Sequence, residues 1–578
     1  MSNWKSVYEK WDAWDTLDSS LKQELEKMKD NETQLEDAFY TELTFGTGGM
    51  RGILGPGINR MNVYTVRKAV SGLANNLLNR HEDAKERGVV VAYDSRYMSK
   101  EFAEEAAKVL GYFGIKSYVF ESLRPTPLLS YTVRHLKTAA GIMITASHNP
   151  PEYNGFKVYN EQGAQITPQE AEVIISEIGK VGNELNVPYI EKEDAEQRGL
   201  LNRIGEEVDE AYLAELLNIS KLDEEDQDRG PFEIVFTPLH GTAFHLVTEG
   251  LRQLGFTNVS VVPEQAVPDP EFSTVTSPNP EEHQAFEMAI ELGEKQGADL
   301  LLGTDPDADR LGVAVKNEQG VYQVLTGNQL GVLLLDYILS HTDKTSLATA
   351  RMIKTIVTTE LGRAVADYYS VPTLETLTGF KFIAEKIGEF EQTGETFIFG
   401  FEESYGYLID SFARDKDAVQ AAVMASEMAY YWKKQGKTLL DALDVLFERH
   451  GYYIEDMTSL TLKGKKGSEQ IQSLMKQMRE NTLKEVAGLS VEVQEDYLTS
   501  ERVHLKENRT ETIDLPQENV LKFVLEDEVW ICLRPSGTEP KIKCYYGVCE
   551  STRDQSEKQL TRLKEEMEAK LDQMIARS

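Results

Sequence analysis

Short apolar runs alternate with amphipathic segments through much of the chain. Val89–Ala92, Lys116–Phe120 and Ala140–Ile144 are rich in apolar residues and are bounded by polar ones, which predicts buried strands. Ser99–Tyr112 and Pro127–Leu136 place apolar residues three and four positions apart, which predicts helices between these strands. This βαβα order is typical of a doubly wound, largely parallel sheet.

The same rhythm restarts twice further along the chain. Phe232–Phe236 and Asp299–Gly303 predict strands of a second α/β unit, and Thr396–Phe399 predicts a strand of a third unit that starts near Leu325. From about Gly451 strands and helices mix, and the chain ends in a charged amphipathic helix. We therefore expect three α/β domains followed by an α+β domain.

The N-terminal forty residues have a different pattern. Trp11, Trp14, Leu17 and Leu21 recur at helical spacing in an acidic background, which predicts a helical packing extension without chemistry of its own. The predicted domain boundaries are 1–44 for this extension, 45–205, 206–322 and 323–450 for α/β domains I, II and III, and 451–578 for domain IV.

Composition narrows the class of protein. The 578 residues are 41% hydrophobic and 27% charged, so the chain can bury several cores, and this composition argues against general disorder. A net charge of −35 argues against nucleic acid or an anionic membrane as a partner. No apolar run reaches membrane-spanning length, and three cysteines without a Cys-x-x-Cys pair suit a reducing cytoplasm.

Four loops that are dense in polar groups each follow a predicted apolar strand. They begin at Ser147, Asp305, Glu402 and Arg534. Ligand sites of open α/β sheets form beyond the carboxyl ends of the strands. The sequence therefore predicts one cleft that all four loops line.

The loop Thr145-Ala-Ser147-His148-Asn149-Pro150-Pro151 carries the predicted chemistry. Its prolines forbid an immediate helix, so Ser147 is expected on a stiff loop beside His148, with Lys157 a short distance on. A nucleophile, a proton carrier and a cation suit phosphoryl transfer, although a hydroxyl-rich turn is the commoner meaning of a Ser-His pair. A serine hydrolase is disfavoured, because adjacent residues of an extended segment point to opposite faces and His148 would then not reach Ser147.

Asp305-x-Asp307-x-Asp309 places three carboxylates at alternate positions. Three such groups would repel one another unless a cation lies among them, which favours Mg²⁺ over a solvated acidic turn. A calcium-binding EF-hand would need glycine and glutamate where Arg310 and Lys316 stand, so that site is excluded.

The remaining motifs indicate ligand binding. Arg534-x-Ser536-Gly537-Thr538 combines a forked cation with hydroxyls and backbone donors, as a phosphate clamp would. Glu402-Glu403-Ser404 could bind sugar hydroxyls, although a surface turn is the better explanation of this motif on its own. The glycine-rich Phe45–Gly52 segment could hold an anion with Arg51, and a tight turn with a surface arginine remains the alternative.

Two aspartates further along are predicted to begin a helix. Asp415 and Asp417 precede a helical pattern, which would leave Arg414 and Lys416 available to the cleft.

Together these motifs resemble the α-D-phosphohexomutase family. The resemblance rests on Thr145-Ala-Ser-His-Asn-Pro150, Asp305-Pro-Asp-Ala-Asp-Arg310, Gly400-Phe-Glu-Glu-Ser-Tyr-Gly406 and Arg534-Pro-Ser-Gly-Thr-Glu-Pro540, in the family's order. It implies a four-domain phosphohexomutase architecture: three α/β domains with mixed sheets sandwiched by helices, and a C-terminal α+β domain, around a central cleft.

The resemblance also implies roles for matching residues. Ser147 would be the phosphoserine and would share one Mg²⁺ with Asp305, Asp307 and Asp309. Residues implied to assist phosphoryl transfer are Arg51, His148, Lys157 and Arg310. Residues implied to bind the substrate are Gly379, Lys381, Glu402, Ser404, Lys416, Arg534, Ser536, Gly537 and Thr538.

The implied activity is interconversion of α-D-glucose 1-phosphate and D-glucose 6-phosphate, with glucose 1,6-bisphosphate as intermediate and activator. Thr378-Gly379-Phe380-Lys381-Phe382 resembles the glucose form of the sugar loop rather than the mannose form. Mannose and pentose phosphates remain alternatives, as does a non-catalytic sugar-phosphate sensor. Small sugar phosphates are the expected partners, and the oligomeric state is left open.

Overall fold

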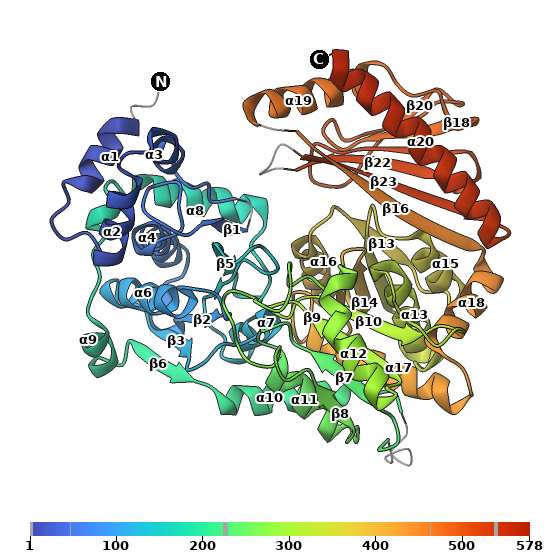
Figure 1. The fold of residues 1–578 in the computed structure, drawn as a ribbon, viewed down its shortest axis with the longest axis horizontal. Coiled ribbons are helices and arrows are strands. Elements are labelled where there is room, and N and C mark those ends of the chain that lie inside the picture. Colours follow the sequence, from blue (N-terminus) through green and yellow to red (C-terminus); the bar gives the residue numbers. More distant parts are fainter. Residues whose placement is uncertain (1–3, 47, 223–228, 463, 537–540, 578) are drawn as a thin grey trace. The chain divides into compact units, whose positions relative to one another are not determined.

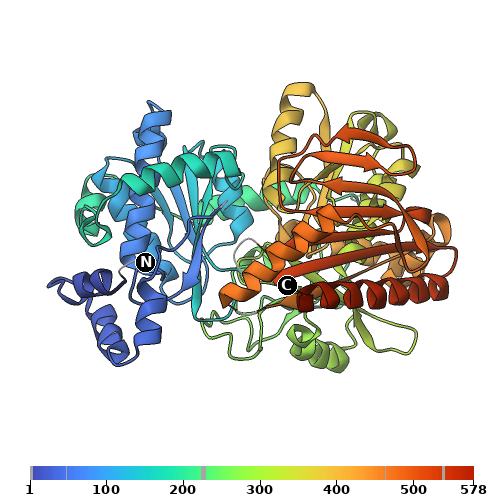
Figure 2. The same cartoon turned by 90° about the horizontal axis from the view of Figure 1, so that it is seen from above.

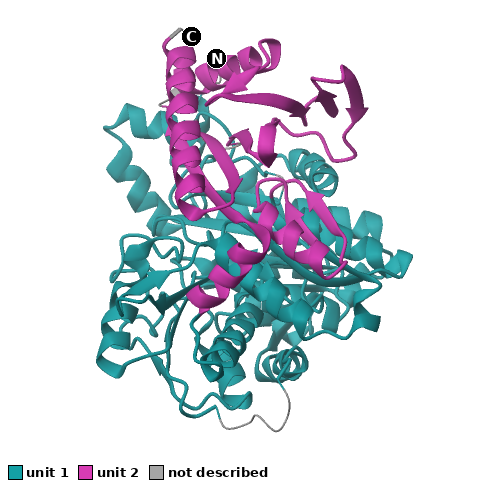
Figure 3. Cartoon of the chain, turned by 90° about the vertical axis from the view of Figure 1, so that its right-hand side faces the viewer, with its two compact units in different colours: residues 1–352, 379–438 teal, residues 353–378, 439–578 magenta. Residues whose placement is uncertain are grey.

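A computed structural model of the chain describes residues 4–46, 48–222, 229–462, 464–536 and 541–577. The chain divides into two compact units, shown in Figure 3. Unit 1 contains residues 1–352 and 379–438, and unit 2 contains residues 353–378 and 439–578.

The first part of unit 1 is a helical extension followed by a sheet that helices cover on both faces (Figure 1). Its elements are α1 (Trp4–Asp12), α2 (Ser19–Met28), α3 (Glu32–Phe39), β1 (Gly49–Ile53), α4 (Val63–Arg80), α5 (Ala84–Arg87), β2 (Val89–Tyr93), α6 (Ser99–Tyr112), β3 (Ser117–Phe120), α7 (Thr126–His135), β4 (Ala140–Ile144), β5 (Tyr153–Tyr159), α8 (Pro168–Lys180), α9 (Lys192–Gln197) and β6 (Leu201–Ile204).

The first sheet has the strand order β1-β5-β4-β2-β3-β6. Strands β4, β2, β3 and β6 run parallel, whereas β5 is antiparallel to both β4 and β1. All five residues of β4 are buried, because α4, α6 and α8 share a core with one face and α7 contacts the strand from the other. This explains the uninterrupted apolar run that predicted the strand, since a parallel strand is covered on both faces.

The helical extension packs on α4. Trp11 has no exposed surface, its ring meets those of Phe39 and Tyr64 edge to face, and its indole N–H donates to Glu184 Oε1 at 2.8 Å. The N-terminal helices therefore have a small core of their own, as the apolar spacing predicted.

The second α/β part of unit 1 repeats the plan of the first. Its elements are α10 (Glu206–Asn218), β7 (Ile234–Thr237), α11 (Phe244–Gln253), β8 (Val259–Val261), α12 (Glu287–Gln296), β9 (Leu300–Thr304), β10 (Leu311–Lys316) and β11 (Tyr322–Val324). The sheet order is β11-β10-β9-β7-β8, with β9, β7 and β8 parallel and β10 antiparallel to β9.

The third part supplies a hairpin and four helices to unit 1. Its elements are α13 (Gly327–Ser340), α14 (Lys344–Leu347), β12 (Ala350–Thr355), α15 (Glu360–Tyr368), β13 (Thr373–Thr376), α16 (Phe380–Thr393), β14 (Thr396–Glu402), β15 (Gly406–Leu408) and α17 (Ala418–Lys434). The four strands form one sheet in the order β13-β12-β14-β15, and β14 pairs with β15 antiparallel. Helix α15 and strand β13 belong to unit 2.

The rest of unit 2 is a large antiparallel sheet, and two of its helices share a core with one face of this sheet. Its elements are α18 (Leu439–His450), β16 (Tyr452–Thr461), α19 (Gly464–Glu480), β17 (Glu485–Val486), β18 (Leu489–Asp496), β19 (Glu501–His504), β20 (Arg509–Thr512), β21 (Leu521–Leu525), β22 (Trp530–Pro535), β23 (Lys541–Glu550) and α20 (Arg553–Arg577). Figure 2 shows α20 lying along β23 and β16, which it contacts. The C-terminal α+β domain predicted from the mixed pattern is thus confirmed.

One structural pattern recurs at all four polar loops. Each loop joins a strand to its antiparallel neighbour: β4 to β5, β9 to β10, β14 to β15 and β22 to β23. The first polar residue of each loop therefore stands at the carboxyl end of the first strand, and the second strand runs back beside that strand. In the first sheet this returning strand, β5, carries Lys157.

Candidate active site

Ser147 follows β4 in an unusual backbone conformation. Its φ angle is +52°, which is left-handed and costs a residue other than glycine about 1–2 kcal/mol. The Ser147 amide donates a hydrogen bond to Thr145 Oγ1 at 2.8 Å, and 6% of the residue is exposed. The sequence suggested an extended segment here, but the backbone turns at Ser147.

This conformation overturns the expectation about His148. Ser147 Oγ lies 3.1 Å from His148 Nδ1, so the two neighbouring side chains do meet. The prediction that they would point to opposite faces was wrong because it assumed an extended backbone, and a left-handed residue turns the chain instead. His148 is thus placed to exchange a proton with the serine.

Ser147 also contacts the aspartate loop, although 158 positions separate the two in sequence. Its hydroxyl donates to Asp305 Oδ2 at 2.7 Å. The structure therefore joins the carboxyl ends of β4 and β9, two strands of different sheets, at one point. This is the arrangement that the common-cleft interpretation requires of the first two loops.

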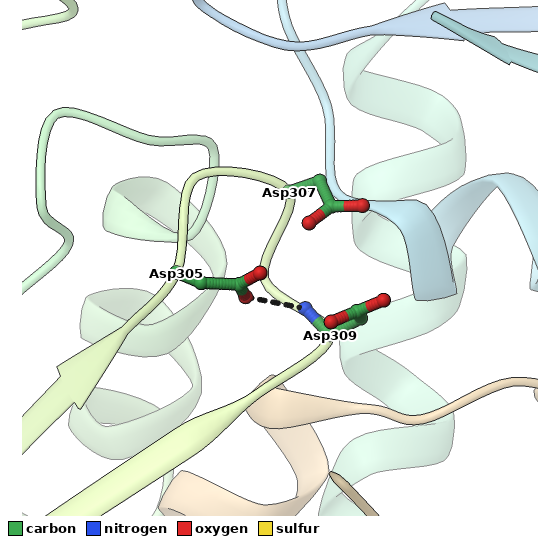
Figure 4. Close-up of side chains that lie close together, drawn as sticks. All are labelled: Asp305, Asp307 and Asp309. Carbon is green, nitrogen blue, oxygen red and sulfur yellow. Dashed lines mark hydrogen bonds between the residues drawn. The ribbon is translucent and has the colours of Figure 1, made fainter. Parts of the chain in front are cut away.

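The three aspartates converge beyond β9 (Figure 4). Asp305 and Asp307 are fully buried and Asp309 is 3% exposed, and one carboxylate oxygen of each lies within 4.8 Å of the others. Asp305 Oδ1 accepts from the amides of Asp309 and Arg310, both at 3.0 Å, which shapes the loop.

The donor set suits a hard divalent cation. Within the described part of the chain, the buried oxygens Asp307 Oδ1 and Asp309 Oδ1 have no hydrogen-bond donor. Buried carboxylate oxygens without a donor are costly unless a cation occupies the space between them. Oxygen ligands from three carboxylates fit Mg²⁺, so the residues present are compatible with the metal that the sequence predicted.

Two lysines neutralise part of this negative charge. Lys157 Nζ lies 2.8 Å from Asp307 Oδ2 and 3.6 Å from Asp309 Oδ2, and Lys416 Nζ lies 3.1 Å from Asp309 Oδ2. Burial favours neutral Asp307, but the charge of Lys157 and the hydrogen bonds to this carboxyl together outweigh burial and hold its pKa well below the usual range. Burial opposes the charge on both lysines as well, yet the neighbouring carboxylates raise the pKa of each, so both stay cationic.

The pKa of Asp305 and the pKa of His148 shift in opposite directions in this buried site. Burial, together with the charges of Asp309 and Asp307, raises the pKa of Asp305 well above its usual value. Burial and the positive charge of Arg310 lower the pKa of His148 well below its usual value. His148 is therefore a neutral imidazole at neutral pH and can accept a proton.

Thr126 is a contact that sequence inspection missed. At the start of α7, its hydroxyl donates to Asp307 Oδ2 at 2.9 Å and its amide donates to the Asp307 carbonyl at 2.9 Å. The residue is fully buried. The Pro-Thr-Pro sequence around it marked the start of a helix, and nothing local indicated a partner 181 positions away.

Two arginines complete the positive side of the site. Arg51, on the edge strand β1, donates to Asn149 Oδ1 of the serine loop at 2.8 Å. Arg310 forms an ion pair with Glu281, a residue to which no role had been given, and its Nε lies 3.8 Å from Asp309 Oδ1. Both predicted arginines therefore border the loops that carry Ser147 and the aspartates.

The sugar-loop candidates gather around Glu402. Strand β14 continues through Glu402, so this residue ends the strand instead of lying in the loop as predicted. Its Oε1 accepts from the Gly379 amide at 2.8 Å, and it is 4% exposed. Burial raises the pKa of Glu402, while nearby Lys416 opposes this shift. Ser404 is half-buried in the turn between β14 and β15.

Gly379 and Lys381 stand at the start of α16. Gly379 has a φ of +122°, a conformation that favours glycine, and it precedes the first residue of the helix. Lys381 is half-buried in the first turn, with its Nζ 5.3 Å from the Phe382 ring centroid.

The segment before α17 differs in part from expectation. Asp417 caps the helix as predicted, because its Oδ1 accepts from the amides of Val419 and Gln420. Asp415 instead accepts from the Tyr159 hydroxyl at 2.7 Å. Arg414 is 2% exposed and forms an ion pair with Glu391. The prediction that its side chain is available to the cleft was therefore wrong.

The phosphate-clamp candidates belong to unit 2. Strand β22 runs through Arg534, whose side chain is 28% exposed with Nε 3.6 Å from Glu518 Oε1. The Ser536 amide donates to the Lys541 carbonyl at 2.7 Å. Gly537 and Thr538 lie outside the described residues.

Comparison with known proteins covers most of the chain. Four phosphoglucomutase/phosphomannomutase family models match it: alpha/beta/alpha domain I at residues 42–184, domain II at 210–320, domain III at 326–450 and the C-terminal domain at 472–570. The phosphoglucomutase of Staphylococcus aureus strain MRSA252 is 42% identical over 533 residues, which is 92% of this chain and 94% of that protein. The protein of the same name from strain MSSA476 is 42% identical over 544 residues, 94% of this chain and 96% of that protein.

Solved structures share the fold at low identity. The exocytosis-sensitive phosphoprotein parafusin, a phosphoglucomutase from Paramecium in its open form, has a TM-score of 0.68 at 19% identity and covers 93% of this chain and 96% of its own. A phosphoglucomutase/phosphomannomutase family protein from Burkholderia thailandensis has a TM-score of 0.66 at 18% identity and covers 92% and 98%.

Both the serine loop and the aspartate loop lie inside the matched domains, and the relatives match along nearly their whole length. The four-domain order inferred from the motifs is confirmed. The chain therefore belongs to the phosphoglucomutase/phosphomannomutase family, the α-D-phosphohexomutases.

Proposed function

We propose that this mutase is a phosphoglucomutase that interconverts α-D-glucose 1-phosphate and D-glucose 6-phosphate through a phosphoserine at Ser147. The observation that carries the proposal is the 2.7 Å hydrogen bond from Ser147 Oγ to Asp305, at the edge of a buried carboxylate triad. A serine placed beside a cation site and flanked by Lys157 and Arg310 suits phosphoryl transfer rather than acyl transfer.

Phosphoryl transfer takes place in two successive exchanges of P–O bonds. The free hydroxyl of the hexose monophosphate attacks the phosphorus of phosphoserine, the P–Oγ bond breaks, and a hexose 1,6-bisphosphate results. The attacking hydroxyl gives up its proton, and Ser147 Oγ takes one up. Reversal with the other phosphate of the bisphosphate restores phosphoserine and releases the isomeric monophosphate.

His148 is the candidate for handling the proton at Ser147 Oγ. Its Nδ1 is 3.1 Å from Oγ, and its lowered pKa keeps it neutral and able to accept. Lys157 and Arg310 remain charged and stabilise the negative charge that develops on the transferred group. Arg51 holds Asn149 and so supports the loop that presents the serine.

Asp305, Asp307 and Asp309 would hold one Mg²⁺, with an oxygen of the Ser147 side chain or its phosphate as a further ligand. When bound, the ion supplies positive charge to the phosphoryl oxygens. We propose that the sugar contacts Lys381, Glu402, Ser404 and Lys416. The distal phosphate is proposed to bind Arg534, Ser536, Gly537 and Thr538.

Glucose is the proposed sugar for two reasons. The Gly379-Phe-Lys-Phe382 loop resembles the glucose form of the family, and the relatives that are 42% identical are named phosphoglucomutases. The three cysteines are all free thiols, which suits the proposed cytoplasmic location. Among the described helices, none has the length and apolar character that a bilayer crossing demands.

A comparison of sugars tests the proposal. The purified enzyme, with Mg²⁺ and added glucose 1,6-bisphosphate, would be assayed on glucose 1-phosphate, mannose 1-phosphate and ribose 1-phosphate. We expect the highest kcat/KM on glucose 1-phosphate. A higher kcat/KM on mannose or ribose phosphate would replace the proposed substrate, and no turnover of any of the three would overturn the proposed activity.

A further inference from the structure

The backbone of the serine loop is held by one buried arginine that the proposed mechanism does not use. Arg96 follows β2 in the segment Asp94-Ser95-Arg96, and its side chain has no exposed surface. Its Nη2 donates to the carbonyl of Ser147 at 2.6 Å and also to the carbonyl of Asn149. Its Nη1 donates to the carbonyls of Pro150, at 2.8 Å, and Tyr153, at 3.0 Å.

Four carbonyl oxygens within seven consecutive residues therefore bind a single guanidinium. Arginine is suited to this task because its donors form a rigid, planar fork, whereas a lysine ammonium has three donors on one atom. A loop with two prolines and few internal hydrogen bonds needs such an external partner to keep one conformation.

The arginine is itself fixed from several sides. Asp94 Oδ2 lies 3.4 Å from Arg96 Nε, and Asp94 Oδ1 accepts from the Arg96 amide at 3.0 Å and from the Ser99 hydroxyl at 2.7 Å. The Phe272 ring lies 4.9 Å from the guanidinium carbon. Asn154, at the far end of the loop, donates to the Tyr97 carbonyl at 2.8 Å.

We propose that Arg96 is a positioning residue for phosphoryl transfer: it holds Ser147 in its left-handed conformation, so that Oγ faces both Asp305 and His148. Ser147 has a φ of +52°, and its own hydroxyl contacts would be lost if the residue relaxed to an extended backbone. Arg96 acts through the loop backbone and touches no substrate. The inference rests on the proposed function, since Ser147 must be the group that is phosphorylated.

The test compares Arg96→Lys with a matched variant, Arg87→Lys. Arg87 also donates to two backbone carbonyls, Lys137 at 3.1 Å and Thr138 at 3.1 Å, but neither belongs to the serine loop. We expect Arg96→Lys to lower kcat about 100-fold, as loss of alignment at a reacting group does, with little change in KM. Arg87→Lys should keep the wild-type kcat.

A second readout separates positioning from general stability. Hydrogen–deuterium exchange followed by mass spectrometry should show faster exchange in peptides covering residues 145–154 of Arg96→Lys, with unchanged protection in peptides covering β2 and α6. If Arg96 only stabilised the fold, exchange would rise throughout the first sheet, and the folded fraction of the variant would turn over at the wild-type rate. Either of those results would overturn the proposal.

Asp94→Asn provides a variant that keeps Oδ1 as the acceptor for Ser99 and replaces the charged Oδ2 beside Arg96 Nε with a neutral amide group. It should lower kcat in the same direction by a smaller factor. Unchanged kcat in both Asp94→Asn and Arg96→Lys would contradict the positioning role. The proposed function fails in a different way: the wild-type enzyme and Arg87→Lys would then carry no phosphate on Ser147, whatever Arg96 does.

Discussion

Lys157 lies between two buried carboxylates, and this position makes its charge important. Its Nζ is 2.8 Å from Asp307 and 3.6 Å from Asp309, and the returning strand β5 carries it to the aspartate loop. Sequence inspection selected Lys157 because it follows Ser147 closely. The reason for its placement is structural, because β5 is antiparallel to β4.

Lys157→Met should reduce kcat by about 100- to 1,000-fold, because it removes a fixed charge from the site where negative charge develops. The measurement is kcat at saturating Mg²⁺ and glucose 1-phosphate. Lys192→Met is the control, since Lys192 pairs with Glu104 at 2.9 Å away from these loops. A Lys157→Met enzyme with wild-type kcat would exclude the role given to this lysine.

Thr126→Val should weaken activation by Mg²⁺ about 10-fold, because the Thr126 hydroxyl orients Asp307 and groups that orient a metal ligand contribute about this much to affinity. The change is nearly isosteric. Thr132→Val is the matched control on the same helix, since the Thr132 hydroxyl donates to the Leu128 carbonyl of its own helix. Equal Mg²⁺ concentrations for half-maximal velocity in the two variants would contradict the prediction.

At the scale of elements, strands were predicted better than the turns that follow them. The strand Ala140–Ile144 was predicted with its observed bounds, because a strand buried on both faces leaves an unbroken apolar run. The ends of β14 and β22 were placed too early, before Glu402 and Arg534, since polar residues at a strand's end look like loop residues. The orientation of His148 was not predictable, because the sequence of the motif does not indicate that Ser147 adopts a left-handed backbone conformation.

Helix α17 begins at a carboxylate that is costly to ionise. Asp417 is fully buried, where burial outweighs its hydrogen bonds and raises its pKa from 3.8 to about 6. A pKa raised on folding means that the folded state binds the proton more tightly. The resulting stability is fully present below about pH 4 and is lost as the pH rises through about 6.

Asp417→Asn should remove this pH dependence, because asparagine keeps a cap oxygen without a charge. The stability of the variant relative to wild type should therefore improve by about 1 kcal/mol between pH 5.5 and pH 8. Thermal melts of both proteins at the two pH values provide the comparison. If the stability of Asp417→Asn relative to wild type stays constant or falls from pH 5.5 to pH 8, the pKa of Asp417 is not raised on folding.

At the scale of the whole molecule, unit 2 joins a segment of the third domain to the C-terminal sheet. Lys522 on β21 donates to the Ile356 carbonyl at 2.9 Å and lies 3.8 Å from Glu360. The fully buried Lys354 pairs with Glu360 at 2.9 Å and with Glu375 at 2.8 Å. The segment 353–378 is thus tied to the C-terminal domain by buried charges, which the domain boundaries drawn from sequence did not anticipate.

Lys522→Met should destabilise unit 2 by about 2 kcal/mol, because it removes the donor to the Ile356 carbonyl and leaves the buried carboxylate cluster with one cation fewer. Urea unfolding followed by tryptophan fluorescence would report this, since Trp530 lies in the same sheet and its ring is 5.1 Å from Lys522 Nζ. Lys506→Met removes a solvent-exposed ion pair with Glu492 and should leave the unfolding midpoint unchanged. Equal midpoints for both variants would count against a structural role of the buried cluster.

The net charge of the chain contrasts with the cationic side chains around the site. The chain carries a net charge of −35, yet four cationic side chains border the loops of Ser147 and the aspartates: Arg51, Lys157, Arg310 and Lys416. These cations offset the carboxylates around the site, and a bound Mg²⁺ would add further positive charge where the anionic substrate is proposed to bind.

Transfer of labelled phosphate tests the central claim most directly. After brief incubation with ³²P-labelled glucose 1-phosphate, a rapid quench and peptide mapping, the label should appear on Ser147 of the wild-type enzyme, and Ser147→Ala should carry no label and show no mutase activity. An active Ser147→Ala enzyme, or label on another residue of the wild type, would contradict the account.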